Sequence, residues 1–288
     1  MNETGAPAWR RLGVIAGGGR LPVLLASAES QADRAPFVIR LNGFADQDYA
    51  NWEGQEFNLG AVGSIQNALK NAGCDAVCFS GNVKRPDIRT LAPADLTAAR
   101  LLPKAIAAGM KGDDALLRVV LEAFESAGFT VVGADNVLAG LIPSAGVFGD
   151  HQPSGRDLTD AHKALAIARA IGGLDIGQGA VVCDGLVLAV EAQEGTDAML
   201  QRVANLPGEI RGAPGQRRGV LGKAPKPIQE RRMDLPVIGV STVRNAARAG
   251  MSGIAVEAGG TLVVDRQAVI NAANEDGLFV TAINPNDQ

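Results

Sequence analysis

The segment KAPKPIQERRMDLPVIGV, residues 223–240, gathers cationic side chains around a carboxylate. The cations around Asp234 are Lys223, Lys226, Arg231 and Arg232. Three prolines in the same segment prevent a regular helix. Clustered cations balance the negative charges of phosphates, and a carboxylate among them can hold Mg²⁺. The segment therefore predicts a site for a phosphorylated ligand, with an exposed basic loop as the alternative.

A second acidic cluster follows a hydrophobic run, in EAQEGTDAML, residues 191–200. Glu191, Glu194 and Asp197 lie close together in the chain, with Thr196 beside them. Oxygen ligands of this kind suit a hard cation. The alternative is that Thr196 and Asp197 cap the helix that follows.

The glycine-rich segment VIAGGGRLP, residues 14–22, follows an expected strand. A dinucleotide fingerprint needs G-x-G-x-x-G and an acidic residue about 20 positions later. Gly17 and Gly19 fill the first two places, but Pro22 fills the third, and no acid follows the second strand before Asp46. The pattern disfavours NAD and leaves an anion site at a helix N-terminus. A tight turn that binds nothing is the alternative.

Two further loops carry polar side chains. SGNVKRPD, residues 80–87, lies past the end of a probable strand, where ligands collect in open α/β sheets. Its Asn82, Lys84 and Arg85 could contact a phosphate or sugar, or could be solvated. In KGDDA, residues 111–115, helix capping explains the acids without a metal.

Strands and helices that position these residues alternate along the first half of the chain. The strands are expected at 12–16, 37–41, 75–81 and 130–134, and the helices at 21–32, 61–73, 95–109 and 113–127. This alternation predicts an α/β fold with a mostly parallel, doubly wound sheet.

The second half predicts a further α/β unit. Helices are expected at 160–173, 196–206, 241–249 and 265–276, and a hairpin at 179–192 that turns at Asp184-Gly185. The predicted domains are a Rossmann-like N-terminal domain (1–143), a Pro/Gly/Ser-rich linker (144–157) and a C-terminal mixed α/β catalytic domain (158–288).

Composition narrows the function classes. The 288 residues carry a net charge of −4 and no basic block, which argues against nucleic-acid binding. The three cysteines form no CxxC pair and only two histidines are present, which favours reduced thiols, a cytoplasmic location and no zinc site. We find neither a signal peptide nor an apolar run of about 18 residues that could cross a bilayer.

Taken together, these segments resemble the LpxI family of UDP-2,3-diacylglucosamine pyrophosphatases. The resemblance runs over most of the chain. It rests on LGVIAGGGRLP, CFSGNVKRPD, KGDDALLR, DIGQGAVVCDGLVLAVEAQEGTDAMLQR and KAPKPIQERRMDLPVIG, of which the last two are the most specific.

The resemblance implies a cytoplasmic enzyme of lipid A biosynthesis, peripheral to the inner membrane. Such an enzyme hydrolyses the diphosphate of UDP-2,3-diacylglucosamine to UMP and 2,3-diacylglucosamine 1-phosphate (lipid X), with Mg²⁺ or another divalent cation. It also implies a ligand held between the two domains. The essential aspartate of the family, in the pattern R-x-D-x-P, falls on Asp234.

We therefore assign candidate roles by residue. Asp234, Lys223 and Lys226 are the catalytic candidates, and the candidate metal ligands are Asp234, Glu191, Glu194 and Asp197. The candidates for substrate binding are Gly17, Gly18, Gly19, Asn82, Arg85, Lys111, Gln178, Thr196, Gln229 and Arg232. An NAD(P)- or nucleotide-sugar-dependent enzyme and a non-catalytic nucleotide-sugar-binding protein are the alternatives, and a homodimer is left open.

Overall fold

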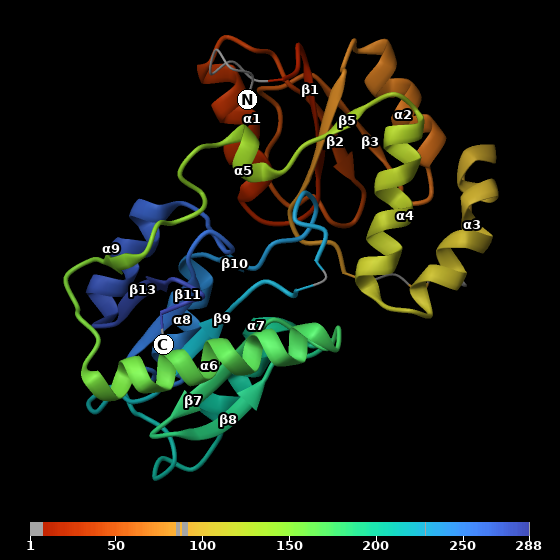
Figure 1. Cartoon of the computed structure of the whole chain (residues 1–288). Coiled ribbons are helices and arrows are strands. Elements are labelled where there is room, and N and C mark those ends of the chain that lie inside the picture. The colour runs from red at the N-terminus through yellow and green to blue at the C-terminus, as the bar shows by residue number, and fades with distance from the viewer. Residues whose placement is uncertain (1–7, 85–86, 88–91, 228, 288) are drawn as a thin grey trace. The chain divides into compact units, whose positions relative to one another are not determined.

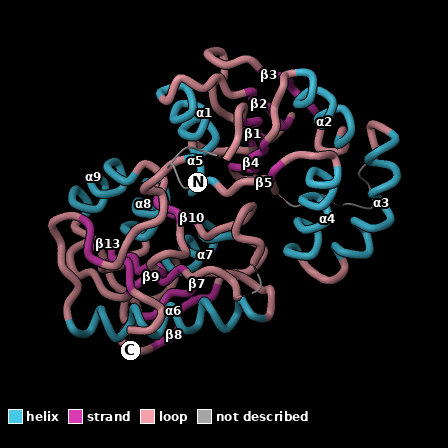
Figure 2. The backbone as a smooth tube through the Cα atoms, turned by 45° about the horizontal axis from the view of Figure 1, so that its top comes forward, coloured by secondary structure: helices cyan, strands magenta, loops and turns pink. Residues whose placement is uncertain are grey.

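The structure is a computed structural model that describes residues 8–84, 87, 92–227 and 229–287 (Figure 1). The chain forms two compact units. The first comprises Met1–Ala139 and Glu230–Asp234, and the second comprises Gly140–Gln229 and Leu235–Gln288. Both units combine helices with sheets, as Figure 2 shows by colour, which confirms the predicted α/β class.

The first unit follows the predicted alternation of strands and helices. Its elements are β1 (Leu12–Ala16), α1 (Leu21–Gln31), β2 (Phe37–Leu41), β3 (Gly54–Phe57), α2 (Val62–Asn71), β4 (Ala76–Ser80), α3 (Leu96–Gly109), α4 (Asp113–Ser126), β5 (Thr130–Val131) and α5 (Ala134–Val137). The short strand β3 was not expected from the sequence. Its Gly54-Gln55-Glu56-Phe57 has no fully buried residue, so it lacks the apolar run that marks the inner strands.

The sheet of the first unit is parallel throughout and has the order β3-β2-β1-β4-β5. Helices α1 and α5 cover one face, and α2 and α4 cover the other (Figure 1). On the latter face Ile15, Ile39 and Val77 pack with Leu69 of α2 and Phe124 of α4. Strand order reverses between β1 and β4, which is where ligands bind in doubly wound sheets. The predicted doubly wound sheet is therefore confirmed.

The second unit is a mixed α/β structure. Its elements are β6 (Gly146–Phe148), α6 (Gly155–Gly173), β7 (Gly179–Cys183), β8 (Leu186–Val190), α7 (Gly195–Ala204), β9 (Val220–Lys223), β10 (Val237–Ile238), α8 (Val240–Arg248), β11 (Gly253–Glu257), β12 (Leu262–Val263), α9 (Arg266–Asp276) and β13 (Phe279–Ile283). The hairpin predicted at Asp184-Gly185 joins β7 to β8.

A six-stranded sheet with the order β6-β13-β11-β9-β7-β8 organises this unit. Its central strands β13, β11 and β9 are parallel, and the flanking pairs are antiparallel. Helix α6 packs on one face, where Leu165 meets Val220 and Ala255. The other face buries side chains of α7, α8 and α9 in the largest apolar cluster of the unit. Among the residues described, no helix is long and apolar enough to cross a membrane.

Helix α6 begins earlier than its apolar spacing predicts, at Gly155 and not at residue 160. Ser154 is its N-cap, and its side chain accepts a hydrogen bond from the Asp157 backbone while the Asp157 carboxylate accepts one from Ser154. This reciprocal capping box can begin a helix within a polar stretch. It lies inside the segment that the sequence favoured as a linker.

Candidate functional site

Lys223 ends the central strand β9 and is only 4% exposed. Its ammonium donates hydrogen bonds to the Thr196 hydroxyl (2.7 Å) and to the Val237 carbonyl (3.2 Å). It makes no ion pair within the part of the chain that the structure describes. Since an ammonium carries three N–H donors, one of them is left for a further acceptor. A buried cation of this kind is suited to bind an anion.

Glu191 follows β8 and is likewise buried, at 6% exposed. Its Oε1 accepts a hydrogen bond from the Thr196 hydroxyl (3.0 Å), and its Oε2 has no partner among the residues described. The Thr196 hydroxyl thus donates to Glu191 and accepts from Lys223. Gly179, which pairs with Lys223 across the sheet, leaves room for this carboxylate, because a Cβ there would lie 2.4 Å from Oε2.

These contacts exclude the capping alternative for Thr196 and Asp197. Helix α7 begins at Gly195 with Glu194 as its N-cap, and no side chain caps it. Thr196 contacts Glu191 and Lys223 instead, and Asp197 accepts a hydrogen bond from the Asn245 side chain of α8 (2.9 Å).

The bridging hydroxyl gives a prediction for stability. We expect Thr196→Val to lower the free energy of unfolding by about 1–3 kcal/mol, because it leaves buried polar groups without a partner. Thr196→Ser keeps the hydroxyl and should retain nearly all of the stability. Urea denaturation of the two variants measures the difference, and equal midpoints for both would contradict the bridge.

Lys226, Gln178 and Gln229 meet beside this site. The Lys226 ammonium forms an ion pair with Asp175 (2.6 Å), and both side chains are largely buried. Gln229 accepts a hydrogen bond from the Lys226 backbone (3.0 Å) and donates one to Gln178 (3.3 Å). The loop after β9 is therefore tied to the loop before β7. Asp175 was not singled out in the sequence, because a single acid in LDIGQG gives no signal.

Together, Lys223, Glu191 and Thr196 lie at the end of the sheet where parallel strand β9 finishes. Ligands in α/β sheets bind at the carboxyl ends of parallel strands. We therefore take this end of the second unit's sheet as one part of the candidate site.

The other two acids of the predicted metal cluster have partners of their own. Glu194 forms an ion pair with Arg202, and Asp197 is bound by Asn245. A hydrogen bond from the Glu194 backbone is the main cause that holds the pKa of Glu194 below its usual value, and the Arg202 guanidinium adds to that effect. Across the described residues, no three His, Cys, Asp or Glu side chains form a group that could hold a metal ion. The metal assignment of Glu191, Glu194 and Asp197 stays a prediction.

Asp234 belongs to the first unit, with the rest of the segment Glu230–Asp234. The sequence-based boundaries put this segment in the C-terminal domain. The Asp114 carboxylate of α4 accepts a hydrogen bond from the Glu230 backbone (2.8 Å), and Met233 packs against the apolar core of the first unit. Asp114 therefore holds this segment. It does not cap α4 as expected from the sequence, because the N-cap of α4 is Gly112 and no described side chain caps the helix.

Arg232 reinforces that attachment through two carboxylates. It pairs with Glu230 (2.9 Å) and with Glu125 of α4 (2.8 Å). The hydrogen bond from Arg232 is the main reason why the pKa of Glu230 is lowered. The Glu230 and Asp234 backbones close a turn, with the Asp234 N–H donating to the Glu230 carbonyl (3.1 Å). The half-buried Asp234 carboxylate thus sits on a segment fixed by α4.

The glycine-rich turn lies at the switch point between β1 and β4, and its three backbone N–H groups already have acceptors. Gly17 donates to the Ser80 carbonyl (2.8 Å), Gly18 to the Asn82 carbonyl (2.9 Å) and Gly19 to the Asp46 carboxylate (2.8 Å). The hydrogen bond from Gly19 is the main cause of the lowered pKa of Asp46.

Asp46 was noted in the sequence only as the first acid after the second strand. In the structure its carboxylate occupies the acceptor position at Gly19, which a phosphate would otherwise take. This geometry agrees with the absence of a dinucleotide fingerprint. A role of Gly17, Gly18 and Gly19 in substrate binding stays a prediction, and it requires that a ligand displace Asp46 or bind elsewhere on the turn.

Two of the remaining substrate-binding candidates, Asn82 and Lys111, lie on exposed loops of the first unit. The Asn82 side chain is exposed next to the glycine turn, and Lys111 is exposed just before α4. Arg85 lies outside the described residues. Contacts within the chain do not test whether Asn82, Lys111 or Arg85 binds the substrate, so this role stays a prediction.

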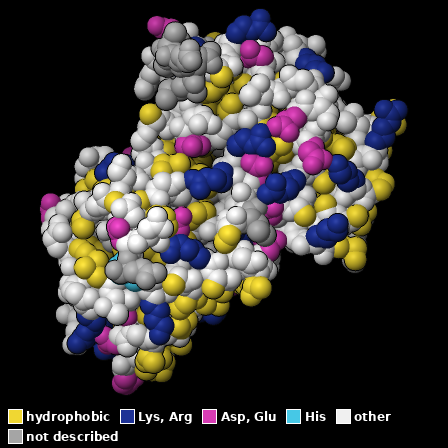
Figure 3. Space-filling view, viewed as in Figure 1, with side chains coloured by type: hydrophobic (Ala, Val, Ile, Leu, Met, Phe, Trp, Pro, Cys, Tyr) yellow, Lys and Arg dark blue, Asp and Glu magenta, His cyan; other side chains and the backbone are white. Residues whose placement is uncertain are grey.

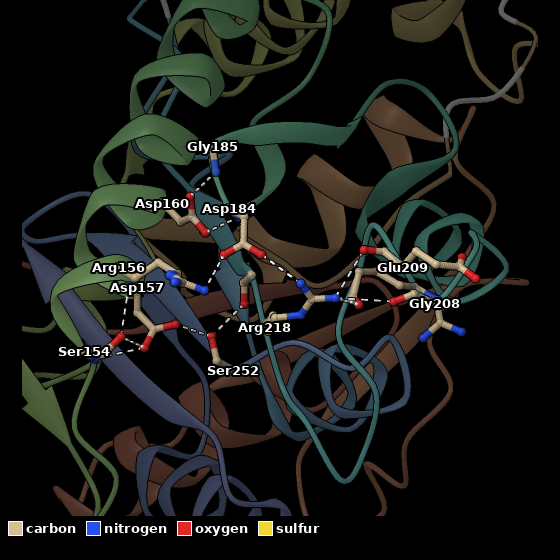
Figure 4. A network of polar contacts seen from close by, with 12 residues as sticks. Ser154, Arg156, Asp157, Asp160, Asp184, Gly185, Gly208, Glu209, Arg218 and Ser252 are labelled. Carbon is tan, nitrogen blue, oxygen red and sulfur yellow. Dashed lines mark hydrogen bonds and ion pairs between the residues drawn. The ribbon is translucent and has the colours of Figure 1, made fainter.

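A polar network at the amino ends of β9 and β11 has a structural role (Figure 4). Asp160 of α6 is 2% exposed and accepts hydrogen bonds from the backbones of Asp184 and Gly185 (both 2.8 Å). Arg156 and Arg218 both pair with Asp184. A surface depression here is lined by residues of the same network. The network lies at the end of the sheet opposite Lys223. We therefore infer that its role is to hold the β7–β8 turn in place.

We expect Asp160→Ala to lower the free energy of unfolding by about 2–3 kcal/mol, because two part-buried backbone hydrogen bonds lose their buried, charged acceptor. Thr159→Ala is the matched control, since the Thr159 hydroxyl donates only within its own helix, to Gly155. Thermal denaturation of both variants tests this. Equal loss of stability in the two would overturn the structural role of Asp160.

The fold and these sites define a class: an α/β protein with a Rossmann-like unit and a mixed-sheet unit that carries a buried cation at the ends of its parallel strands. The LpxI N-terminal domain family matches residues 11–141, and the LpxI C-terminal domain family matches residues 144–281. The chain therefore belongs to the LpxI family.

A curated relative agrees with this membership. UDP-2,3-diacylglucosamine pyrophosphatase LpxI of Caulobacter vibrioides (strain ATCC 19089 / CIP 103742 / CB 15) is 56% identical over 279 residues, 97% of this chain and 99% of the relative. Among solved structures, CobK precorrin-6A reductase matches with a TM-score of 0.34 and 15% identity, over 96% of this chain and 90% of that one. A putative NAD-dependent epimerase/dehydratase from Methylobacillus flagellatus matches with a TM-score of 0.28 and 10% identity, over 82% of this chain and 57% of that one.

Proposed function

We propose that this chain hydrolyses the diphosphate of UDP-2,3-diacylglucosamine to UMP and 2,3-diacylglucosamine 1-phosphate, as a step of lipid A biosynthesis. The observation that carries the proposal is the 56% identity, over 97% of the chain, to a relative named for this pyrophosphatase activity. The matches to both LpxI domains support it. The proposed location is the cytoplasmic surface of the inner membrane, where a lipid-linked substrate is accessible.

In the proposed reaction, the oxygen of a water molecule bonds to one phosphorus while the bond from that phosphorus to the bridging oxygen breaks. Negative charge develops on the leaving phosphate. The buried Lys223 ammonium, which has an N–H left over and no ion pair among the described residues, is suited to stabilise that charge. The Thr196 hydroxyl and the Val237 carbonyl hold the ammonium in place.

Lys226 has a smaller part in this proposal. Its ammonium is already paired with Asp175, so its charge is partly neutralised before any phosphate binds. We propose that it orders the loop around Gln178 and Gln229, which would then present their amides to the substrate. Arg232, Asn82, Arg85 and Lys111 stay as proposed contacts for the nucleotide or sugar.

A divalent cation, Mg²⁺ in the first instance, is proposed as the cofactor. Mg²⁺ is usually held by one or two carboxylates together with substrate phosphates, so a group of three protein acids is not required. Asp234 is the proposed protein ligand. Glu191, one of whose buried oxygens has no partner among the described residues, is a better candidate ligand than Glu194 or Asp197. When bound, the cation would polarise the phosphoryl oxygens.

The proposal is tested by incubating the full chain with UDP-2,3-diacylglucosamine in detergent micelles and scoring UMP. We expect release of UMP with Mg²⁺ and its loss with EDTA. UDP-N-acetylglucosamine, which lacks the two acyl chains, is the control substrate. Binding of the lipid nucleotide without UMP release would favour a non-catalytic binding protein. A rise in melting temperature with NAD(P)H alone would favour the alternative class of Rossmann enzymes.

A further inference from the structure

Helix α3 and the turn after it form a cationic segment without acidic residues. Residues 96–112 read LTAARLLPKAIAAGMKG, with three basic residues and neither Asp nor Glu. The whole chain has a net charge of −4, so this stretch departs from the charge balance of the protein. Neither the proposed chemistry nor the core of the first unit accounts for that pattern.

The burial of α3 is one-sided. Ala98 is its only fully buried residue, and Leu101, Leu102 and Ile106 are half-buried on the side that packs on α4. The exposed positions recur at helical spacing and form one face, which we call the outer face of α3. It consists of Leu96, Ala99, Arg100, Pro103, Lys104, Ala107, Met110 and Lys111.

The outer face of α3 displays large apolar side chains to solvent. Leu96 is 65% exposed and Met110 is 75% exposed. In the described part of the first unit, these are the two large hydrophobic side chains that are exposed. In Figure 3 hydrophobic and basic side chains lie over the region of α3. Both residues lie on the same exposed face of the helix.

Cations flank those apolar side chains. Lys104 pairs with Glu122 of α4 (2.6 Å), with both side chains more than half exposed. Arg100 and Lys111 make no ion pair within the described residues, so their charges are available to a partner. Exposed basic residues are attracted to anionic lipid headgroups, and neighbouring apolar side chains can enter the interface.

We propose that the outer face of α3 docks on a lipid bilayer that contains anionic phospholipids. Met110 and Leu96 enter the headgroup region, and Arg100 and Lys104 contact lipid phosphates. Charge complementarity selects this partner, because a cationic face without acids is matched by an anionic surface. The inference deepens the proposed function, since an enzyme acting on a lipid-linked nucleotide has to reach its substrate at such a surface.

The test is co-flotation of the full chain with phosphatidylcholine vesicles, with and without phosphatidylglycerol. We expect binding that depends on phosphatidylglycerol and weakens with salt. The variant Arg100→Glu/Met110→Ser should lower the partition coefficient by about tenfold or more, since charge reversal replaces attraction by repulsion. Lys111 is left unchanged because it is also a candidate for substrate binding.

The matched control is Arg248→Glu/Leu174→Ser in the second unit. The exposed fraction of Leu174 is 73%, similar to the 75% of Met110. Arg248 is exposed, and among the described residues its side chain donates only to Asn245. The control should bind vesicles as the unchanged protein does. Equal loss in both variants, or unchanged binding of Arg100→Glu/Met110→Ser, would overturn the proposal. Light scattering of Arg100→Glu/Met110→Ser tests a second copy as the partner. If this variant no longer formed a dimer but still bound vesicles, the proposal would be overturned and the face would be assigned to a second copy of the chain.

Hydrolysis in detergent micelles separates this proposal from the proposed function. Arg100→Glu/Met110→Ser should release UMP from micellar substrate at the unchanged rate and lose activity only on substrate in vesicles. If the unchanged protein releases no UMP from micelles, the proposed function fails, and vesicle binding still decides the docking proposal.

Discussion

Asp234→Asn should lower the rate of UMP release by about 100-fold or more, because it removes the carboxylate charge at the proposed reaction centre. The fold should persist. The Asp234 backbone N–H still closes the turn to Glu230, and Arg232 still ties the segment to Glu125. Activity in micelles and melting temperature are measured on the same preparation. We expect the melting temperature to stay within about 3 °C of the unchanged protein.

Asp33→Asn is the matched control for this substitution. Asp33 is exposed and has a φ of 55°, in the left-handed region that asparagine adopts readily. It should retain full activity and stability. Near-normal turnover by Asp234→Asn would exclude Asp234 as the essential carboxylate and would weaken the proposed reaction at its centre.

Lys223→Met has the second large expected effect. Methionine fills a similar volume but removes the ammonium, so stabilisation of the leaving phosphate is lost and the rate should fall by about 100-fold or more. A buried charge without an ion-pair partner is costly to desolvate, so an apolar side chain of similar size offsets the hydrogen bonds that the variant loses. We therefore expect a low kcat together with a nearly unchanged midpoint of urea denaturation.

Lys226→Met is the comparison that separates catalysis from structure. Its removal leaves the largely buried Asp175 carboxylate without its cation, which destabilises the fold. We expect this variant to lose more stability and less kcat than Lys223→Met. If Lys226→Met lowered kcat more than Lys223→Met does, the ion pair with Asp175 would not limit the role of Lys226 in the reaction.

Most of the secondary structure could be predicted from local patterns. The buried strand Leu12–Ala16 has no polar side chain, Phe37–Leu41 is apolar except for Arg40, and the Asp184-Gly185 turn fixes a hairpin. Elements without those signals were missed or shortened. Strand β3 has no apolar run, and the start of α6 depends on a capping box in a polar stretch.

The residue types of the site could be predicted from the sequence, but the residues that contact them could not. The motif around Lys223 and Asp234 pointed to an anion site, and the structure ties Lys223 to Thr196 and the segment of Asp234 to Asp114. The contacts that hold them come from residues without a sequence signal. Asp114 binds the Glu230 backbone from more than a hundred positions away, and Asp175 neutralises Lys226 across the second unit.

By itself, the sequence determined the α/β class, the parallel sheet of the first unit and the motifs that place the chain in the LpxI family. These follow from short-range patterns, in which residue type and spacing act directly on backbone conformation. Only the tertiary structure decided that Glu230–Asp234 packs with the first unit, that Thr196 bridges Glu191 to Lys223, and that Asp46 occupies the glycine turn. Each of these depends on which distant chain segment supplies the hydrogen-bond partner, and spacing along the chain does not specify that partner.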